Sequence, residues 1–289
     1  MTTSLTVKSR KTLLTAVAWM FGATLSLSFM AVAGRELSHE LTTGQIVFFR
    51  NFVGLVVMTI AMSYFGWGAS RTNYFRFHVL RNTTHFFGQY AWFYGIAFLP
   101  LAEVFALEFT APIWTTILAA IFIGERLNRE RVALIGLGFI GILMMVRPGL
   151  SIISPVSLIV LLGAFLYAGS YTTTKFLSSY DSPITIVFYM TLIQFPIAFV
   201  FAIPNFHWPS SSAYPWVIGV GVCALTAHYC MVRSFKLAKA SIVVPVDFLR
   251  LPLIACVAYV FYQETADFWI ILGGTIVFLS TWLNTRLRD

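Results

Sequence analysis

The chain has 289 residues, of which 58% are hydrophobic and only 10% charged. A soluble domain carries roughly 25% charged residues, and a chain this apolar lacks the polar residues to cover a water-exposed surface. Composition therefore excludes a soluble enzyme or binding domain and predicts an all-α integral membrane protein.

Long apolar runs separated by breakers predict ten spans of roughly 20 residues each. The breakers include Gly66-Trp67-Gly68, Leu99-Pro100 and Ser182-Pro183. In chain order, the expected spans are 12–34, 44–64, 77–98, 101–124, 131–147, 155–176, 183–204, 214–236, 240–262 and 267–285. The first span is too long for a cleaved signal peptide.

Basic residues predict the orientation, because cytoplasmic loops are enriched in Lys and Arg. With the amino terminus in the cytoplasm, 14 of the 19 Lys and Arg residues fall in cytoplasmic segments and two on the other side. Three lie within spans. We therefore expect both termini in the cytoplasm, and the net charge of +8 reflects topology rather than nucleic-acid binding.

The sequence also repeats itself. A shift of 139 residues places Glu125 on Glu264 and Glu108 on Asp247. We expect two five-span repeats, residues 1–149 and 150–289. Because five is odd, the second repeat enters the membrane inverted, an arrangement typical of transporters with substrate sites near the midplane.

Several motifs carry a family resemblance. Leu99-Pro100-Leu101-Ala102-Glu103, Gly124-Glu125-Arg126-Leu127, and Arg50 and Arg81 in the preceding spans resemble the first repeat of the EamA family of the drug/metabolite transporter superfamily. The resemblance implies ten helices, a central cavity and peripheral fifth and tenth helices. It leaves the substrate open, since the family moves amino acids, vitamins, nucleotide derivatives, organic cations and drugs.

Charged residues inside spans are costly and mark candidate functional sites. Glu108 and Asp247 each lie roughly 10–12 Å deep. They are candidates for binding a cation or carrying a proton, and Arg250, Arg50 and Arg81 are further candidates for contact with substrate. The alternative is internal pairing, of Asp247 with Arg250 three residues on and of Glu108 with Arg50 or Arg81. Glu125 and Glu264, at span ends, are expected to pack or cap.

Other polar and aromatic residues complete the candidate site. His85 and His228 are candidates for proton relay or for hydrogen bonds between helices. Aromatic rings in a cavity would stack on a planar group or hold a cation. The aromatic candidates are Trp19, Tyr90, Trp92, Tyr167 and Tyr229. Pro112, Pro245 and Pro252 are expected to kink spans four and nine.

These features predict a secondary active transporter of a small organic metabolite that works by alternating access. Amino acids, vitamins or cofactors, and organic cations are the expected classes, and coupling to protons or sodium is open. A passive facilitator or channel and a multidrug or metabolite exporter are the alternatives. We expect a location in the bacterial inner membrane, in contact with lipid, and no enzyme activity, cofactor, metal or nucleic acid; a homodimer is left open.

Overall fold

In the computed structural model, regular structure is entirely helical over the described residues, 10–123, 129–146, 154–204, 206–237, 246–247, 249–265 and 267–286. The first half contains α1 (Arg10–Leu37), α2 (Thr43–Phe65), the 3-10 helix η1 (Trp67–Ser70), α3 (Phe75–Phe98), α4 (Leu101–Glu108), α5 (Ala111–Ile123) and α6 (Arg129–Val146). The second half contains α7 (Pro155–Leu177), α8 (Pro183–Ala202), α9 (Tyr214–Leu237), α11 (Arg250–Tyr262) and α12 (Phe268–Arg286).

Local chemistry fixes several helix ends. Thr42 and Gln45 form a capping box at the start of α2, in which each side chain bonds the other residue's backbone N–H. Gly66 ends the same helix with φ +92°, a conformation that favours glycine. The Ser182 hydroxyl accepts from the Thr185 N–H at the start of α8.

Over the described residues the helix bounds lie close to the predicted spans except in the fourth; residues 240–245 of the ninth span lie outside the described residues. The fourth predicted span is two helices, because the chain turns at Phe109 and Thr110 between α4 and α5. Five helices, α1, α2, α7, α8 and α9, contain stretches long and apolar enough to cross a membrane. Shorter apolar stretches lie in α6, α11 and α12. The fold is therefore that of a multi-helix membrane protein.

Two of the predicted kink prolines begin helices instead of bending them. Pro112 is the second residue of α5, and Pro252 is the third residue of α11. In the first turn of a helix the backbone N–H has no partner within the helix, so a proline costs little there. Pro112 thus follows the interruption of the fourth predicted span. Pro245 lies outside the described residues.

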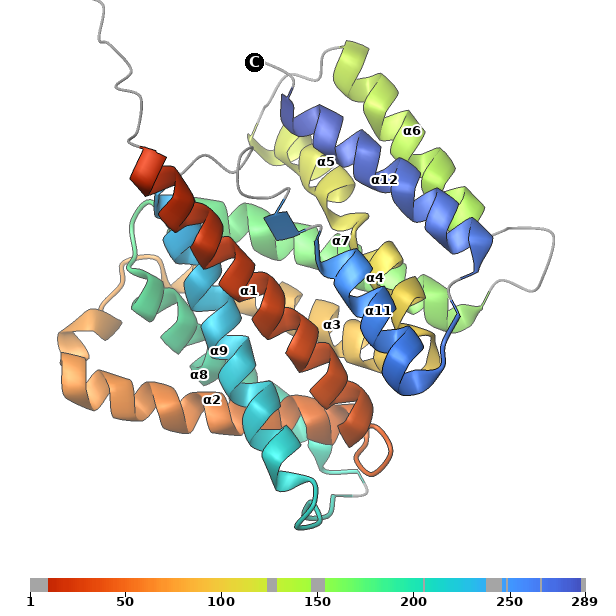
Figure 1. The fold of residues 1–289 in the computed structure, drawn as a ribbon. Coiled ribbons are helices and arrows are strands. Elements are labelled where there is room, and N and C mark those ends of the chain that lie inside the picture. The colour runs from red at the N-terminus through yellow and green to blue at the C-terminus, as the bar shows by residue number, and fades with distance from the viewer. Residues whose placement is uncertain are drawn as a thin grey trace, which may run out of the picture.

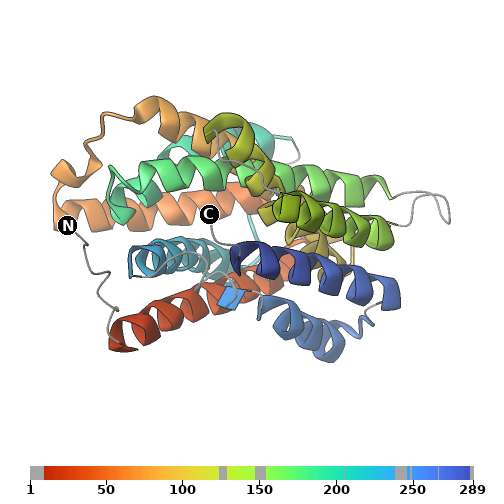
Figure 2. The ribbon, with the colours of Figure 1, turned by 90° about the horizontal axis from the view of Figure 1, so that it is seen from above.

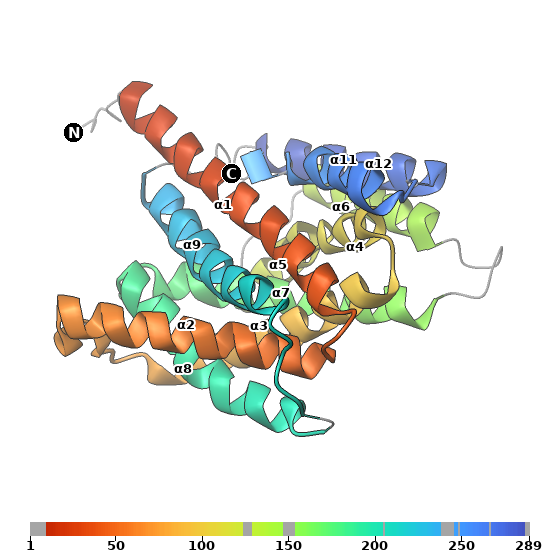
Figure 3. The same cartoon turned by 60° about the horizontal axis from the view of Figure 1, so that its bottom comes forward.

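Helices α1 and α9 run side by side and lie oblique to α2 (Figures 1 and 3), and Figure 2 shows the same bundle from above. Helix α1 packs along α9, α3 along α7, and α2 against α8. Helices α6 and α12 pack on each other at the side of the bundle away from α2 (Figures 1 and 3). The short helices α4 and α11 are in contact with each other, so each half contributes one interrupted segment to the same region.

Small residues let the helices approach closely. A Cβ added to Gly88 in α3 would lie 3.0 Å from the Gly163 carbonyl oxygen in α7. One added to Gly141 in α6 would lie 2.7 Å from the Gly273 carbonyl oxygen in α12. Such contacts are typical of helix packing in membranes, where burial of apolar surface gives no driving force.

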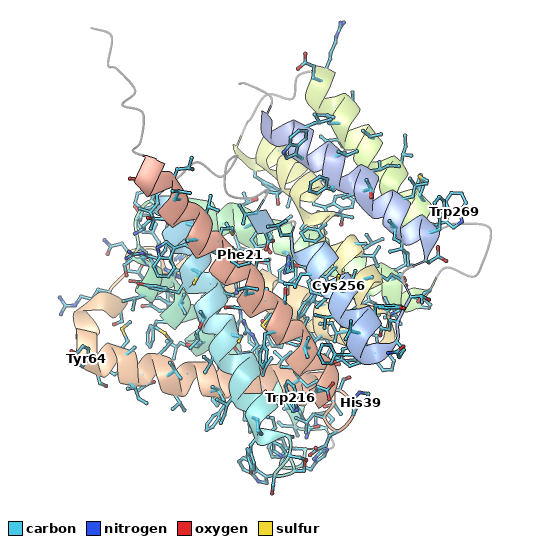
Figure 4. All side chains as sticks on the ribbon, in the orientation of Figure 1. Phe21, His39, Tyr64, Trp216, Cys256 and Trp269 are labelled. Carbon is cyan, nitrogen blue, oxygen red and sulfur yellow. The ribbon has the colours of Figure 1, made fainter. Side chains whose placement is uncertain are left out.

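Large apolar and aromatic side chains cover the outside of the bundle. Tyr64 and Trp269 extend outward from the ends of α2 and α12 (Figure 4). Aromatic residues at span ends are typical of membrane–water interfaces. This surface suits lipid rather than water.

Candidate functional site

The central charged group lies where α4 meets α11. Arg250, in the first turn of α11, donates from Nη2 to Glu108 Oε1 at 3.0 Å and to Asp247 Oδ2 at 3.1 Å. The exposed fractions of the three side chains are 4%, 8% and 19% for Arg250, Glu108 and Asp247. We call these residues the Glu108–Arg250–Asp247 triad. It holds two carboxylates and one guanidinium, so with all groups ionised it carries one excess negative charge.

Neighbouring helices orient the two carboxylates. The Trp92 indole, on α3, donates from Nε1 to Glu108 Oε2 at 2.8 Å. The Thr24 hydroxyl, on α1, lies 3.3 Å from Asp247 Oδ1. The Arg250 guanidinium lies 5.1 Å from the ring centres of both Phe105 and Phe109, where cation–π attraction adds to the ion pairs. The triad therefore joins α1, α3, α4 and α11.

The structure confirms one predicted pairing and corrects another. Asp247 and Arg250 pair at a separation of three residues, as expected. Glu108 pairs with Arg250 rather than with Arg50 or Arg81. The physical reason is the contact between α4 and α11, which the sequence repeat alone does not reveal.

Arg50 and Arg81 lie in a second polar group, formed by α2, α3, α8 and α9. Arg50 donates to the Asn51 side chain at 3.3 Å, and Arg81 donates to Thr174 at 3.1 Å and Asn82 at 2.6 Å. No carboxylate among the described residues forms an ion pair with either arginine. Both guanidiniums are thus held by neutral groups.

The two candidate histidines belong to this second group. The His85 and His228 ring centres are 5.0 Å apart, and the Gln194 amide nitrogen lies 3.0 Å from His85 Nδ1. The charges of Arg50 and Arg81 act on both rings. We call the set of Arg50, Arg81, His85, His228 and Gln194 the arginine–histidine cluster.

The candidate aromatic residues fall in three places. Tyr167, on α7, packs edge-on to His85 at 5.3 Å and stacks with Tyr171 at 6.0 Å. Trp19 and Tyr229 pack together at 5.9 Å between α1 and α9, beside Arg233. Tyr90 packs instead against Phe86 and Phe201. Trp92 and Tyr167 thus contact the polar groups, whereas Tyr90 belongs to an aromatic layer between α3 and α8.

Glu264 acts as a cap, as predicted. Its carboxylate accepts from the Leu101 N–H at the start of α4 at 2.8 Å and pairs with Arg35 at 3.1 Å. Tyr262 donates to Glu36 at 2.7 Å. These contacts tie the end of α1 to the end of α11. Glu125 lies outside the described residues.

An exposed carboxylate joins two loops. Glu40 accepts from the Ser210 N–H and the Ser210 hydroxyl. These hydrogen bonds hold the pKa of the Glu40 carboxyl below its usual range. The link connects the α1–α2 loop to the α8–α9 loop.

Sequence reasoning missed several polar residues of the site because it examined mainly ionisable and aromatic side chains. Gln89, Gln194 and Thr24 are almost fully buried in apolar helices. Amides are as conspicuous as charges in such segments, and a search for them would have found both glutamines.

A helical bundle with charged groups buried at the contact between its halves is the architecture of a membrane transporter. Comparisons with known proteins agree. The pattern of the EamA-like transporter family matches residues 14–147 and again residues 154–286. The chain therefore belongs to the EamA-like transporter family.

Characterised relatives extend along nearly the whole chain. An S-adenosylmethionine uptake transporter of Rickettsia prowazekii is 26% identical, with 94% of this chain and 92% of the relative aligned. A riboflavin transporter of Vibrio cholerae is 27% identical, covering 93% and 92%. The pseudopaline exporter CntI of Pseudomonas aeruginosa is 26% identical, covering 92% and 94%.

One solved structure, described only as the crystal structure of a protein, has the same fold. It has a TM-score of 0.64 at 16% identity, covering 93% of this chain and 96% of its own.

Proposed function

We propose that this protein is a secondary active transporter of a small organic metabolite of the vitamin or cofactor class. The relatives named for S-adenosylmethionine and riboflavin support this class over a passive pore or a multidrug pump. The relatives include both uptake and export proteins, and the proteoliposome assay below measures the direction of transport.

The observation that carries the proposal is the Glu108–Arg250–Asp247 triad. It joins the interrupted segments of the two halves through ion pairs that include two nearly buried side chains. Breaking a buried ion pair is costly unless something replaces the lost partner. A substrate that engages Arg250 or one of the carboxylates can therefore couple its own binding to movement of α4 against α11.

The proposed architecture is two inverted five-helix repeats, residues 1–149 and 150–289, that cross the inner membrane ten times. The helix contacts support it, because they occur in matching pairs. Contact of α1 with α9 corresponds to that of α3 with α7, α2–α8 and α6–α12 each join equivalent helices, and α4–α11 joins the fourth segments of the two repeats. Rocking of one repeat against the other would expose the triad to each side in turn.

A reporter fusion tests this topology. Ten spans that start in the cytoplasm end there, so a reporter active only in the cytoplasm and fused after Asp289 should be active. A periplasmic carboxyl terminus would mean an odd number of spans. The chain could not then consist of two inverted five-span repeats.

We further propose that Glu108 or Asp247 takes up and releases a proton in each cycle. When Arg250 turns toward substrate, one carboxylate loses its counter-ion in a water-poor environment. Protonation removes the cost of that buried charge. The excess negative charge of the triad is consistent with one exchangeable cation, a proton or a sodium ion.

Proteoliposome uptake tests the function. Radiolabelled S-adenosylmethionine and riboflavin are supplied separately, with and without a pH gradient, to wild type, Glu108→Gln and Asp247→Asn. The exposed Glu130→Gln serves as the control. We expect wild type and control to accumulate one substrate, and the site variants to lose accumulation by at least about tenfold, the loss that about 1.4 kcal/mol produces.

The outcomes separate the claims. If the gradient changes neither rate nor extent in wild type, proton coupling is wrong. If both neutral variants accumulate substrate normally, the triad is not the transport site.

A further inference from the structure

We propose that Arg50 and Arg81 form a binding site for an oxyanion group of the transported molecule, a carboxylate or a phosphate. The triad then receives the positively charged part of the same molecule. This inference rests on the proposed transport function and adds the chemical class of the substrate, a metabolite that carries opposite charges at two ends.

The first observation is that Arg50 is buried without adequate partners. Only 2% of Arg50 is exposed. Its hydrogen bond to Asn51 is long, 3.3 Å, and its Nε has no hydrogen-bond partner among the described residues. A guanidinium has five N–H donors, and an unpaired buried charge is expensive. Arg50 therefore has donors available for a ligand.

The second observation is that Arg81, also buried, adds a like charge. Only 3% of Arg81 is exposed, and the charges of the two arginines repel each other. Among the described residues, neither has an ion-pair partner. An oxyanion between them would convert repulsion into two charge-assisted contacts. Arginine matches carboxylate and phosphate with two parallel hydrogen bonds.

The third observation concerns the neutral groups nearby. Arg81, His85, Gln89 and Trp92 follow one face of α3 at spacings of four, four and three residues. Only 1% of Gln89 is exposed, and in the part of the chain that the structure describes neither its amide oxygen nor its amide nitrogen has a hydrogen-bond partner. The Gln194 amide oxygen is also buried without one. Unpaired amides suit the uncharged polar atoms of a metabolite.

The fourth observation connects the two charged groups. Tyr167 packs edge-on to His85 of the arginine–histidine cluster at 5.3 Å, and its helix α7 also contacts α4, which carries Glu108. The rings of Tyr167 and Tyr171 stack at 6.0 Å with an interplanar angle of 14°. The tyrosine pair thus lies on a helix that contacts the helices carrying both charged groups. A planar group stacked on it would place a negative end toward the arginines and a positive end toward the carboxylates.

Thermal unfolding of the purified full-length protein tests the anion site. Sodium acetate and sodium phosphate are each compared with sodium chloride at equal ionic strength. The proteins compared are wild type, Arg50→Gln and Arg50→Lys. Arg76→Gln, which removes the charge of an exposed arginine outside the site, is the control. A second comparison uses S-adenosylmethionine and its decarboxylated form, which differ only in the carboxylate.

In wild type and Arg76→Gln, acetate or phosphate should raise the melting temperature by ~2–4 °C over chloride. The more effective anion identifies the oxyanion. Arg50→Gln should lose this shift while keeping a melting temperature in chloride at or above that of wild type, because it removes an unpaired charge. Arg50→Lys should keep part of the shift. S-adenosylmethionine should bind ~10–100-fold more tightly than its decarboxylated form.

Three results would overturn the inference: no anion-specific shift in wild type, the same shift in Arg50→Gln, or unfolding of Arg50→Gln in chloride, which would make the guanidinium structural. Failure of the proposed function has a different signature. The anion shift would appear and depend on Arg50, yet the proteoliposomes would accumulate neither S-adenosylmethionine nor riboflavin.

Discussion

The two buried charged groups differ in how their charges are balanced. In the triad, one guanidinium lies between two carboxylates that also accept from Trp92 or lie against Thr24. In the arginine–histidine cluster, the described partners of two guanidiniums are neutral. The triad pairs opposite charges within the protein, whereas among the described residues the two guanidiniums of the cluster have no carboxylate partner and Arg50 Nε has no hydrogen bond. Similar burial thus accompanies two kinds of charge balance, which suits the triad to the positive part of the proposed substrate and the cluster to its negative part.

The largest expected effect is that of Arg250→Met. It leaves Glu108 and Asp247 facing each other without a cation, and breaking a buried pair costs about 3–5 kcal/mol. We expect a large fall in melting temperature and loss of transport. Arg250→Met combined with Glu108→Gln should regain part of the stability, since one buried charge is gone. Arg233→Met, exposed on α9, is the control. An unchanged melting temperature in Arg250→Met would contradict the assignment of the triad.

A smaller effect is expected at Trp92. Trp92→Phe removes the donor to Glu108, and a hydrogen bond to a charged group contributes about 1.5–3 kcal/mol. Trp114→Phe is a matched control, because the Trp114 Nε1 is buried without a hydrogen-bond partner. Chemical or thermal unfolding should show the larger loss for Trp92→Phe. Equal losses would mean that ring volume, rather than the bond to Glu108, explains the effect.

Helices α3 and α7 pack against each other and carry residues next to both charged groups. One added methyl group at their interface would push the two helices apart. In Gly88→Ala, the new Cβ would lie 3.0 Å from the Gly163 carbonyl oxygen and 3.1 Å from the Tyr167 ring. Overpacking of this kind costs about 1–3 kcal/mol. In Gly169→Ala on the same interface, the nearest atom is an ordinary 3.8 Å away. Uptake should therefore fall in the first variant and be kept in the second; a reversed order would disprove the role of this contact.

The smallest effect is expected at the exposed Glu40. Because the folded-state pKa of Glu40 is lowered by Ser210, its contribution to stability is present above the unfolded-state pKa of about 4.3. The contribution is lost as pH falls through the folded-state value. Glu40→Gln should thus be slightly less stable than wild type at pH 7, with transport unchanged. The difference should vanish in acid, and a difference that grows in acid would contradict the sign.

Helix positions were largely predictable because their signals are local. The breakers at Gly66, Pro100 and Pro183 end or begin helices within a residue or two of the expected bounds. The i,i+3 pairing of Asp247 with Arg250 is local as well. These features depend on neighbours in sequence, which the sequence states directly.

Partners across helices were less predictable. Glu108 could face several arginines, and the choice of Arg250 depends on how α4 packs against α11. The sequence makes Tyr90 a candidate for the cavity, yet it packs against Phe201 on α8. A small rotation of a helix changes which neighbour a side chain meets, and periodicity alone does not determine that rotation.

The central claim is that both charged groups act on one transported metabolite. The most direct measurement is a thermal-shift screen of wild type against metabolites, because a ligand of the folded state raises its melting temperature. Each metabolite that does so is then repeated with Glu108→Gln, Arg50→Gln and the exposed control Glu130→Gln. The account predicts that the rise disappears in the first two variants and persists in the third. A rise that persists in both Glu108→Gln and Arg50→Gln would contradict it.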